Sequence, residues 1–129
     1  MKRLKDVAIG LALGAATVGA FLALADSPSM DPVKLSPQYY TVRLENDCVR
    51  VLEYRLKPGQ KEILHSHPKG VVIALADATV RTTLADGTVA AQPSASDDVK
   101  WRDGLTHSAE NIGATEAHYI AVELKGCAP

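Results

Sequence analysis

The chain has 129 residues, of which 47% are hydrophobic and 22% charged, and its formal net charge is −1. This length corresponds to one domain. The near-neutral charge excludes a strongly basic nucleic-acid-binding protein, and the aliphatic content together with the low net charge excludes intrinsic disorder.

The N-terminus has the pattern of an export signal. Basic residues at positions 2, 3 and 5 precede an uncharged, apolar stretch over 7–24, and Ala23 to Ala25 form a small-x-small cleavage site. This pattern predicts a secretory signal peptide over 1–25, cleaved after Ala25, and a periplasmic or secreted protein. A retained membrane anchor is the alternative, because the apolar stretch is at the lower length limit for spanning a bilayer.

The two cysteines, Cys48 and Cys127, lie near the two ends of the exported chain. An exported protein resides where disulfides form and persist, so the sequence predicts a disulfide between them. Two unpaired thiols remain the alternative.

After the signal, residues 26–38 are rich in Pro and Ser and indicate an extended linker. The rest of the chain, 39–127, shows short apolar or alternating segments separated by turn residues such as Asp86-Gly87. This spacing predicts an all-β domain, a sandwich or barrel. The expected strands are 39–45, 48–56, 61–67, 71–76, 79–84, 89–92, 99–102, 107–111 and 116–124.

Alternation in the last strand places His118, Ile120 and Val122 on one side, which we expect to face the core. Glu123, and Glu53 in an earlier strand, lie on the opposite side and are expected to be surface charges. For His118 we expect a packed, hydrogen-bonded side chain at the barrel mouth, with a metal ligand or an acid–base group as the alternative.

Three of the four histidines form a candidate metal site. His65 and His67 are two residues apart, so on a strand both project from the same face, and His107 comes from a later strand. Three neutral imidazoles suit Zn, Fe, Ni or Cu better than harder, oxygen-preferring ions.

Two segments resemble the conserved motifs of the cupin superfamily. Gly59 to His67 resembles the first motif, a Gly, five residues and then His-x-His, and Gly104 to Asn111 resembles the second, with its Gly-x-x-His-x-x-x-Asn spacing. The resemblance implies a small jelly-roll barrel (a cupin-type double-stranded β-helix) with a metal held by His65, His67 and His107.

The sequence departs from the cupin pattern at the fourth ligand. The first motif normally supplies a Glu shortly after the second His, where this chain has Val71 and Val72. The resemblance then implies a three-His site, as in the thiol dioxygenase and diketone-cleaving branches. Such a site has one negative charge fewer and at least one more open position for water, oxygen or substrate.

Two hypotheses for function follow. The first is a metal-dependent cupin enzyme that uses Fe, Mn, Ni or Zn in dioxygenase-like or related chemistry on a small molecule. Arg102 is its candidate for binding a substrate carboxylate, with a surface salt bridge as the alternative, and no catalytic acid or base can be named. The second is a metal-free periplasmic module that binds a small ligand or has a structural role.

For partners, we expect a homodimer formed through exposed strand edges. We expect no nucleic acid, and no membrane contact after signal cleavage.

Overall fold

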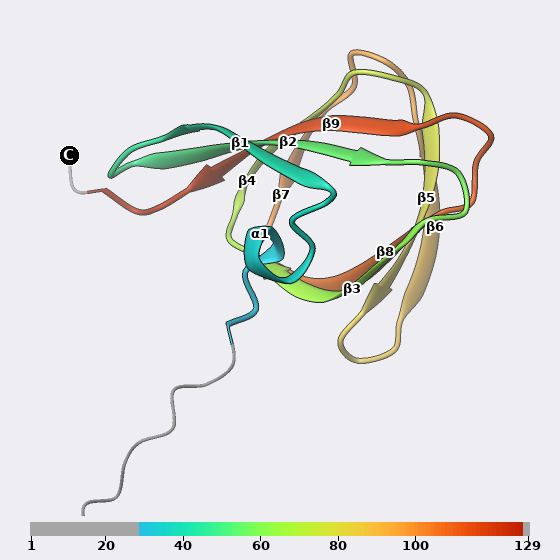
Figure 1. Ribbon diagram of the computed structural model, residues 1–129, viewed down its shortest axis with the longest axis horizontal. Coiled ribbons are helices and arrows are strands. Elements are labelled where there is room, and N and C mark those ends of the chain that lie inside the picture. Colours follow the sequence, from blue (N-terminus) through green and yellow to red (C-terminus); the bar gives the residue numbers. More distant parts are fainter. Residues whose placement is uncertain (1–28, 128–129) are drawn as a thin grey trace, which may run out of the picture.

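The computed structural model describes residues 29–127, so the expected signal peptide 1–25 lies outside the described part of the chain. Within residues 29–127, none of the helical structure is long and apolar enough to cross a bilayer. Two antiparallel sheets face each other and enclose the interior of a small barrel (Figure 1).

The five-stranded sheet has the order β1-β2-β9-β4-β7 and the four-stranded sheet has the order β3-β8-β5-β6. This confirms the predicted all-β jelly-roll barrel. The strands are β1 Tyr40–Glu45, β2 Val49–Leu56, β3 Lys61–His67, β4 Gly70–Ala74, β5 Ala78–Leu84, β6 Val89–Ser94, β7 Val99–Arg102, β8 Leu105–Asn111 and β9 Ala117–Leu124.

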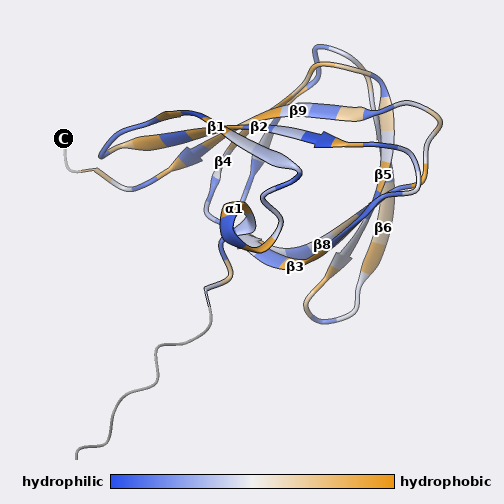
Figure 2. Ribbon diagram, in the orientation of Figure 1, coloured by the Kyte–Doolittle hydropathy of each residue, from blue (hydrophilic) through white to orange (hydrophobic). Residues whose placement is uncertain are grey.

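Alternation and turn chemistry explain most of these strands. In β2, Leu52 and Leu56 are fully buried and alternate with more exposed residues, as the period-2 pattern requires. Between β5 and β6, Gly87 has φ +89°, and the Asp86 carboxylate accepts a hydrogen bond from Thr88 N–H. The hydropathy colouring of Figure 2 shows polar and apolar residues interleaved along the strands.

Among the described residues, seven buried side chains form the apolar core. Its members are Tyr40, Leu52, Tyr54, Leu56, Ala78, Ala117 and Ala121. Most are aromatic or small, so the barrel is not filled by large aliphatic side chains. Space therefore remains in the interior beside the core.

Strand β3 contains a β-bulge. Glu62 pairs with Ala109 and His65 pairs with His107, so β3 advances three residues while β8 advances two. The extra residue reverses the inward–outward alternation, and as a result Glu62 and His65 are both buried although they are three positions apart.

The expectation for β9 was wrong about which side faces inward. Ala117, Ala121 and Glu123 are buried, whereas Ile120 and Val122 are only partly buried on the outer face. The polarity of the interior is the physical reason. The inner face of the barrel carries the polar side chains of the site, so apolar alternation selects the wrong face.

Residues 29–36, here called the N-terminal strap, pack against the barrel. Helix α1 (Pro32–Leu35) is capped by Asp31, whose carboxylate accepts a hydrogen bond from Val33 N–H. Ser66 N–H donates to the carbonyl of Met30, which ties the strap to β3. The described part of the expected extended linker thus contains one helical turn, because Asp31 and Pro32 supply an N-cap followed by a proline at the first helical position.

Cys48 and Cys127 form the predicted disulfide, with their Cα atoms 4.6 Å apart. It joins the β1–β2 turn to the chain just after β9, and Figure 1 shows these two segments extending together from one side of the barrel.

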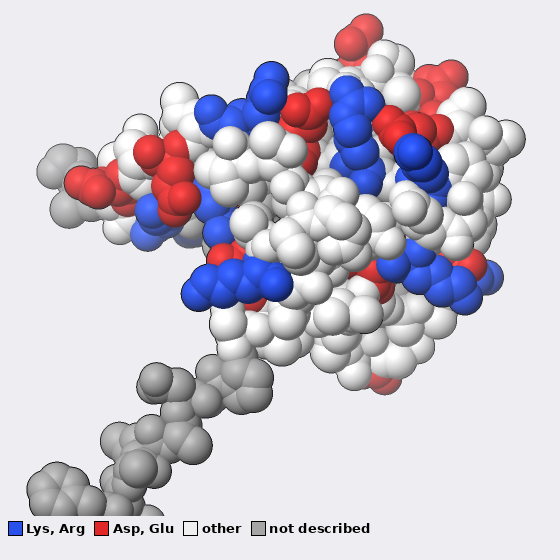
Figure 3. All heavy atoms as spheres, in the orientation of Figure 1, with Lys and Arg blue, Asp and Glu red and all other residues white. Residues whose placement is uncertain are grey.

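On the face shown in Figure 3, acidic and basic side chains are interspersed without a patch of one sign.

Candidate metal centre

The three predicted histidines meet inside the barrel. His65 and His107 are cross-strand partners on β3 and β8, and His67 follows two residues later on the same face of β3. One nitrogen from each ring lies within 4.8 Å of the others, and no other such group of His, Cys, Asp or Glu occurs among residues 29–127. The structure therefore brings together the three residues that the sequence predicted.

Hydrogen bonds orient the two rings of the His-x-His pair. The His65 ring contacts the Ile63 carbonyl through Nδ1 at 2.7 Å, and the His67 ring contacts Glu123 Oε1 through Nδ1, also at 2.7 Å. A carbonyl or carboxylate at Nδ1 holds the proton there and leaves the Nε2 lone pair free. The two Nε2 atoms face each other at 2.9 Å.

The third histidine, His107, is partly buried, and its two ring nitrogens are buried without a hydrogen-bond partner. Burial lowers the pKa of His107 to about 3 and that of His65 to about 4, and burial also lowers the pKa of His67. Neutral imidazoles with free lone pairs are the form that binds Zn, Fe or Ni. The donor set thus fits a divalent transition metal, which His65, His67 and His107 would hold.

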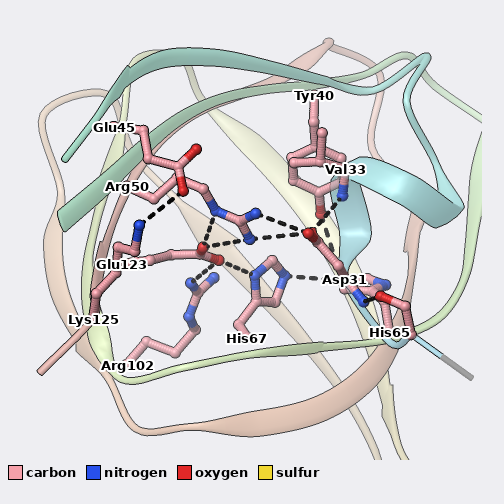
Figure 4. A network of polar contacts seen from close by, with 11 residues as sticks. Asp31, Val33, Tyr40, Glu45, Arg50, His65, His67, Arg102, Glu123 and Lys125 are labelled. Carbon is pink, nitrogen blue, oxygen red and sulfur yellow. Dashed lines mark hydrogen bonds and ion pairs between the residues drawn. The ribbon is translucent and has the colours of Figure 1, made fainter. Parts of the chain in front are cut away.

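Glu123 connects His67 to a partly buried ionic network (Figure 4). Its Oε2 accepts a hydrogen bond from Arg50 Nε at 2.9 Å, and Arg50 also donates through Nη1 and Nη2 to the two carboxylate oxygens of Asp31, at 2.9 and 3.1 Å. Burial alone would raise the pKa of Glu123, but the hydrogen bonds from His67 and Arg50 outweigh burial and hold it below the ordinary value. The expectation that Glu123 is a surface charge was therefore wrong.

A cavity of about 540 Å³ opens beside the histidines and is lined by His67 and His107. Much of its wall is apolar, contributed by Val72, Val80, Leu84, Leu105, Ala109 and Ala121. Trp101 also lines it and is 57% exposed, which places this side chain at its outer edge. Volume and lining match those of small-molecule sites.

Arg102, at the end of β7, lines the same cavity. Its side chain is 15% exposed, and its Nη2 lies 3.6 Å from Glu123 Oε1, which is ion-pair distance but too long for a hydrogen bond. Nε and Nη2 are buried without a hydrogen-bond partner. Arg102 is thus a cavity residue with free donors rather than an exposed salt bridge.

A carboxyl group that the sequence analysis did not single out, Glu62, also lines the cavity. Burial raises the pKa of Glu62 to about 7, although the nearby hydroxyls of Tyr40 and Tyr54 oppose the rise. The β3 bulge directs Glu62 inward, and no apolar pattern in the sequence signals such a bulge.

His118 takes no part in the centre. It lies on the outer face of the five-stranded sheet, where its Nε2 contacts Glu53 Oε1 at 2.8 Å. It is hydrogen-bonded, as expected, but to an outer-face carboxylate instead of at the barrel mouth. Glu53 has a side-chain exposure of 17% and also pairs with Arg43 and Arg55.

The sequence matches no family model and no curated protein. The structure, in contrast, resembles solved cupin domains. A cupin domain from Bordetella pertussis Tohama I shares 25% sequence identity with a TM-score of 0.62, over 67% of this chain and 92% of that chain. A conserved protein with a double-stranded β-helix domain from Klebsiella pneumoniae shares 22% identity with a TM-score of 0.56, over 70% of this chain and 78% of that one.

An enzyme is among the similar structures. The polyketide cyclase RemF from Streptomyces resistomycificus has a TM-score of 0.52 at 12% identity, covering 70% of this chain and 66% of that chain. At such identities the likeness concerns the fold. The fold is the cupin-type jelly roll, and it carries a cluster of three histidines that could bind a metal.

Proposed function

We propose that this protein is an exported, metal-dependent cupin that acts on a small carboxylic acid. His65, His67 and His107 hold one divalent transition ion, Fe, Mn, Ni or Zn, and Arg102 binds the substrate carboxylate. The polyketide cyclase among the similar folds supports a cupin barrel of this kind as an enzyme scaffold.

The single observation that carries the proposal is the environment of His107. Both of its ring nitrogens are buried and make no hydrogen bond, which is costly for a polar side chain that has no ligand. The ring lies beside the inward-facing Nε2 atoms of His65 and His67, with ring centroids 4.6 and 5.3 Å away. Coordination of one ion would satisfy all three side chains.

The ion, the cavity wall and Arg102 would each have a separate role in the reaction. A bound ion would supply Lewis-acid activation and open coordination positions. The apolar cavity wall would exclude water from the reacting groups, and the unpaired Nε and Nη2 of Arg102 would orient a carboxylate through two parallel hydrogen bonds.

A metal-free binding protein is the second candidate, and one observation favours it. The Nε2 atoms of His65 and His67 are 2.9 Å apart, so one additional proton on this pair would form a hydrogen bond between the two rings without an ion, while both Nδ1 protons stay in place. In that case the cavity and Arg102 would capture a small acid without converting it.

Metal analysis separates the two candidates. The full chain is expressed in a host that exports it, purified from the periplasm and analysed by plasma mass spectrometry beside a His65→Ala/His107→Ala variant. We expect near-stoichiometric transition metal in the wild type and none in the double variant. His118→Ala, a histidine on the outer face, is the matched control and should keep its metal. A wild type that stays metal-free after reconstitution with Fe, Mn, Ni and Zn would favour the second candidate.

The same preparation tests export and assembly. The Cys48–Cys127 disulfide is compatible with an oxidising compartment and supports export. Mass measurement of the periplasmic protein should show loss of residues 1–25. Residues 89–93 of the outermost strand β6 are exposed, which supports a homodimer, and sedimentation velocity should show twice the monomer mass.

A further inference from the structure

Glu62 enters the cavity only because of the β3 bulge. Without the extra residue, Glu62 would point out of the barrel while His65 and His67 point in. The bulge leaves Ile63 and Leu64 exposed to 58% and 43%, respectively. Apolar side chains are usually buried and carboxyl groups usually exposed, and the bulge reverses this preference at these three positions. Bulges commonly direct a side chain into a functional site.

One of the two carboxyl oxygens of Glu62 has no hydrogen-bond partner. The side chain is 1% exposed, and its Oε1 makes no hydrogen bond within the described structure. The hydroxyl of Tyr54, also buried, likewise has no partner. Leaving these groups unpaired is costly, so the position is one where a ligand would supply the missing hydrogen bonds.

Glu62 does not belong to the metal-binding group. Its Oε1 approaches His65 from the Nδ1 side, at 3.4 Å, whereas the ring's Nε2 faces His67. Glu62 is accordingly absent from the cluster of nitrogens that could share an ion. Glu62 does line the cavity, so its side chain lies beside the space that a bound molecule would fill.

Among the residues that line the cavity, two charged side chains have buried atoms without a hydrogen-bond partner. Arg102, from the five-stranded sheet, offers the unpaired donors Nε and Nη2, and Glu62, from the four-stranded sheet, offers an unpaired acceptor. The apolar part of the wall includes Val72, Val80 and Ala109. A ligand that satisfies this arrangement has an anionic end, a hydrogen-bond donor and an apolar body.

We infer that the substrate is a hydroxy acid with an apolar body, whose carboxylate binds Arg102 and whose hydroxyl donates a hydrogen bond to Glu62. The inference rests on the proposed function, because it takes the cavity and Arg102 as the substrate site. It goes further by assigning a role to Glu62 and by requiring a hydroxyl group on the substrate.

Calorimetric titration with three related probes tests the inference. Phenyllactate has the carboxylate, the hydroxyl and an apolar ring, hydrocinnamate lacks the hydroxyl, and phenylpropanol lacks the carboxylate. We expect the wild type to bind phenyllactate at least about tenfold more tightly than hydrocinnamate, the effect of one buried hydrogen bond to a charged group, and phenylpropanol more weakly still.

Variants of Glu62 test whether this side chain causes the preference for a ligand with a hydroxyl group. Glu62→Met removes the acceptor at similar volume and should bind phenyllactate and hydrocinnamate equally, while Glu62→Gln keeps an acceptor oxygen and should retain part of the preference. Glu110→Gln is the matched control on the paired strand β8, since Glu110 forms ion pairs with Arg81 and Lys61 away from the cavity, and it should behave as the wild type. The melting temperature of Glu62→Met should equal or exceed that of the wild type, because a buried unpaired carboxyl is removed.

Three results would overturn the inference: equal binding of phenyllactate and hydrocinnamate by the wild type, a hydroxyl preference that survives in Glu62→Met, or no binding of phenyllactate.

Metal content is measured on the same samples. A normal metal content without a hydroxyl preference refutes the role of Glu62 and leaves the metal centre standing, whereas a hydroxyl preference without metal refutes the metal centre alone.

Discussion

At the scale of single residues, the two histidines of the His-x-His pair are held by different means. His65 is fixed by a backbone carbonyl of its own strand, that of Ile63, whereas His67 depends on the side chain of Glu123 from β9. The carbonyl remains whatever side chain occupies position 63. The orientation of His67, in contrast, relies on a carboxylate that is itself held by Arg50.

Substitution of Glu123 should therefore weaken metal binding while the three ligands stay intact. Glu123→Gln removes the charge that favours the Nδ1-protonated form of His67, and loss of such a supporting carboxylate typically lowers metal affinity about 10- to 100-fold. The melting temperature should also fall, because Arg50 and Arg102 lose a buried counter-charge. Competition with a chelator measures the affinity, and thermal unfolding measures the stability.

Glu53→Gln is the control, since Glu53 also contacts a histidine, His118, but through its Nε2 and on the outer face of the sheet. It should leave metal affinity unchanged. An unchanged affinity in Glu123→Gln would show that the orientation of His67 does not depend on this carboxylate.

The sequence predicts the metal-binding residues better than their surroundings. His65 and His67 can be placed on one face by period 2 alone, and the spacing of the second motif adds His107. Glu123 and Glu62 could not be found in this way. The first lies on the side that apolar alternation assigns to solvent, and the second changes side at a bulge that local propensity does not reveal.

At the scale of elements, β4 is confined between β7 and β9, and Gly70 is its tightest position. A Cβ atom built there would lie 2.0 Å from the Val122 carbonyl oxygen, a backbone atom that can move only with its strand. Only a residue without a side chain lets β4 approach β9 this closely.

Gly70→Ala should therefore destabilise the fold by about 2 kcal/mol or more, as expected for overpacking against backbone. Gly104→Ala is the matched control, because the nearest atom to a Cβ there is the His67 carbonyl oxygen at 3.5 Å, an ordinary contact. Urea unfolding of both variants measures the difference. Equal free energies of unfolding for the two variants would mean that β4 and β9 can move apart at Gly70 without destabilising the fold.

The N-terminal strap shows why a short element can be missed. Pro and Ser in this region suggest an extended linker, and one helical turn gives no periodic pattern. The strap is held instead by tertiary contacts, the pairing of Asp31 with Arg50 and the hydrogen bond from Ser66 to Met30. Through Arg50 and Glu123, the strap is connected to the metal-binding residue His67.

At the scale of the whole molecule, the disulfide links positions 79 residues apart in the chain. In the chain-entropy model, closing a loop of this length stabilises a protein by about 4 kcal/mol. Cys48→Ser/Cys127→Ser should lower the free energy of unfolding by a comparable amount, measured by urea unfolding. Reduction of the wild type should give the same result, and a loss below about 1 kcal/mol would show that the bridge restrains the unfolded chain little.

The overall fold follows from the sequence to a large extent. Turn residues such as Asp86-Gly87 delimit the strands, and β3 and β7 have the predicted bounds. The order of strands in each sheet does not follow from local pattern, since β9 lies between β2 and β4, far from both in sequence. The resemblance to the cupin motifs implies the jelly-roll topology, and the structure confirms that topology.

The bulge in β3 also has a consequence for solubility. β3 is at the edge of its sheet, and an edge strand with exposed Ile63 and Leu64 is the kind of segment that seeds intermolecular pairing. The irregular ladder at these two residues makes the edge a poor template, and Met30 of the strap already occupies the amide of Ser66. The same irregularity that directs a carboxyl group inward thus protects the outside of the barrel from aggregation.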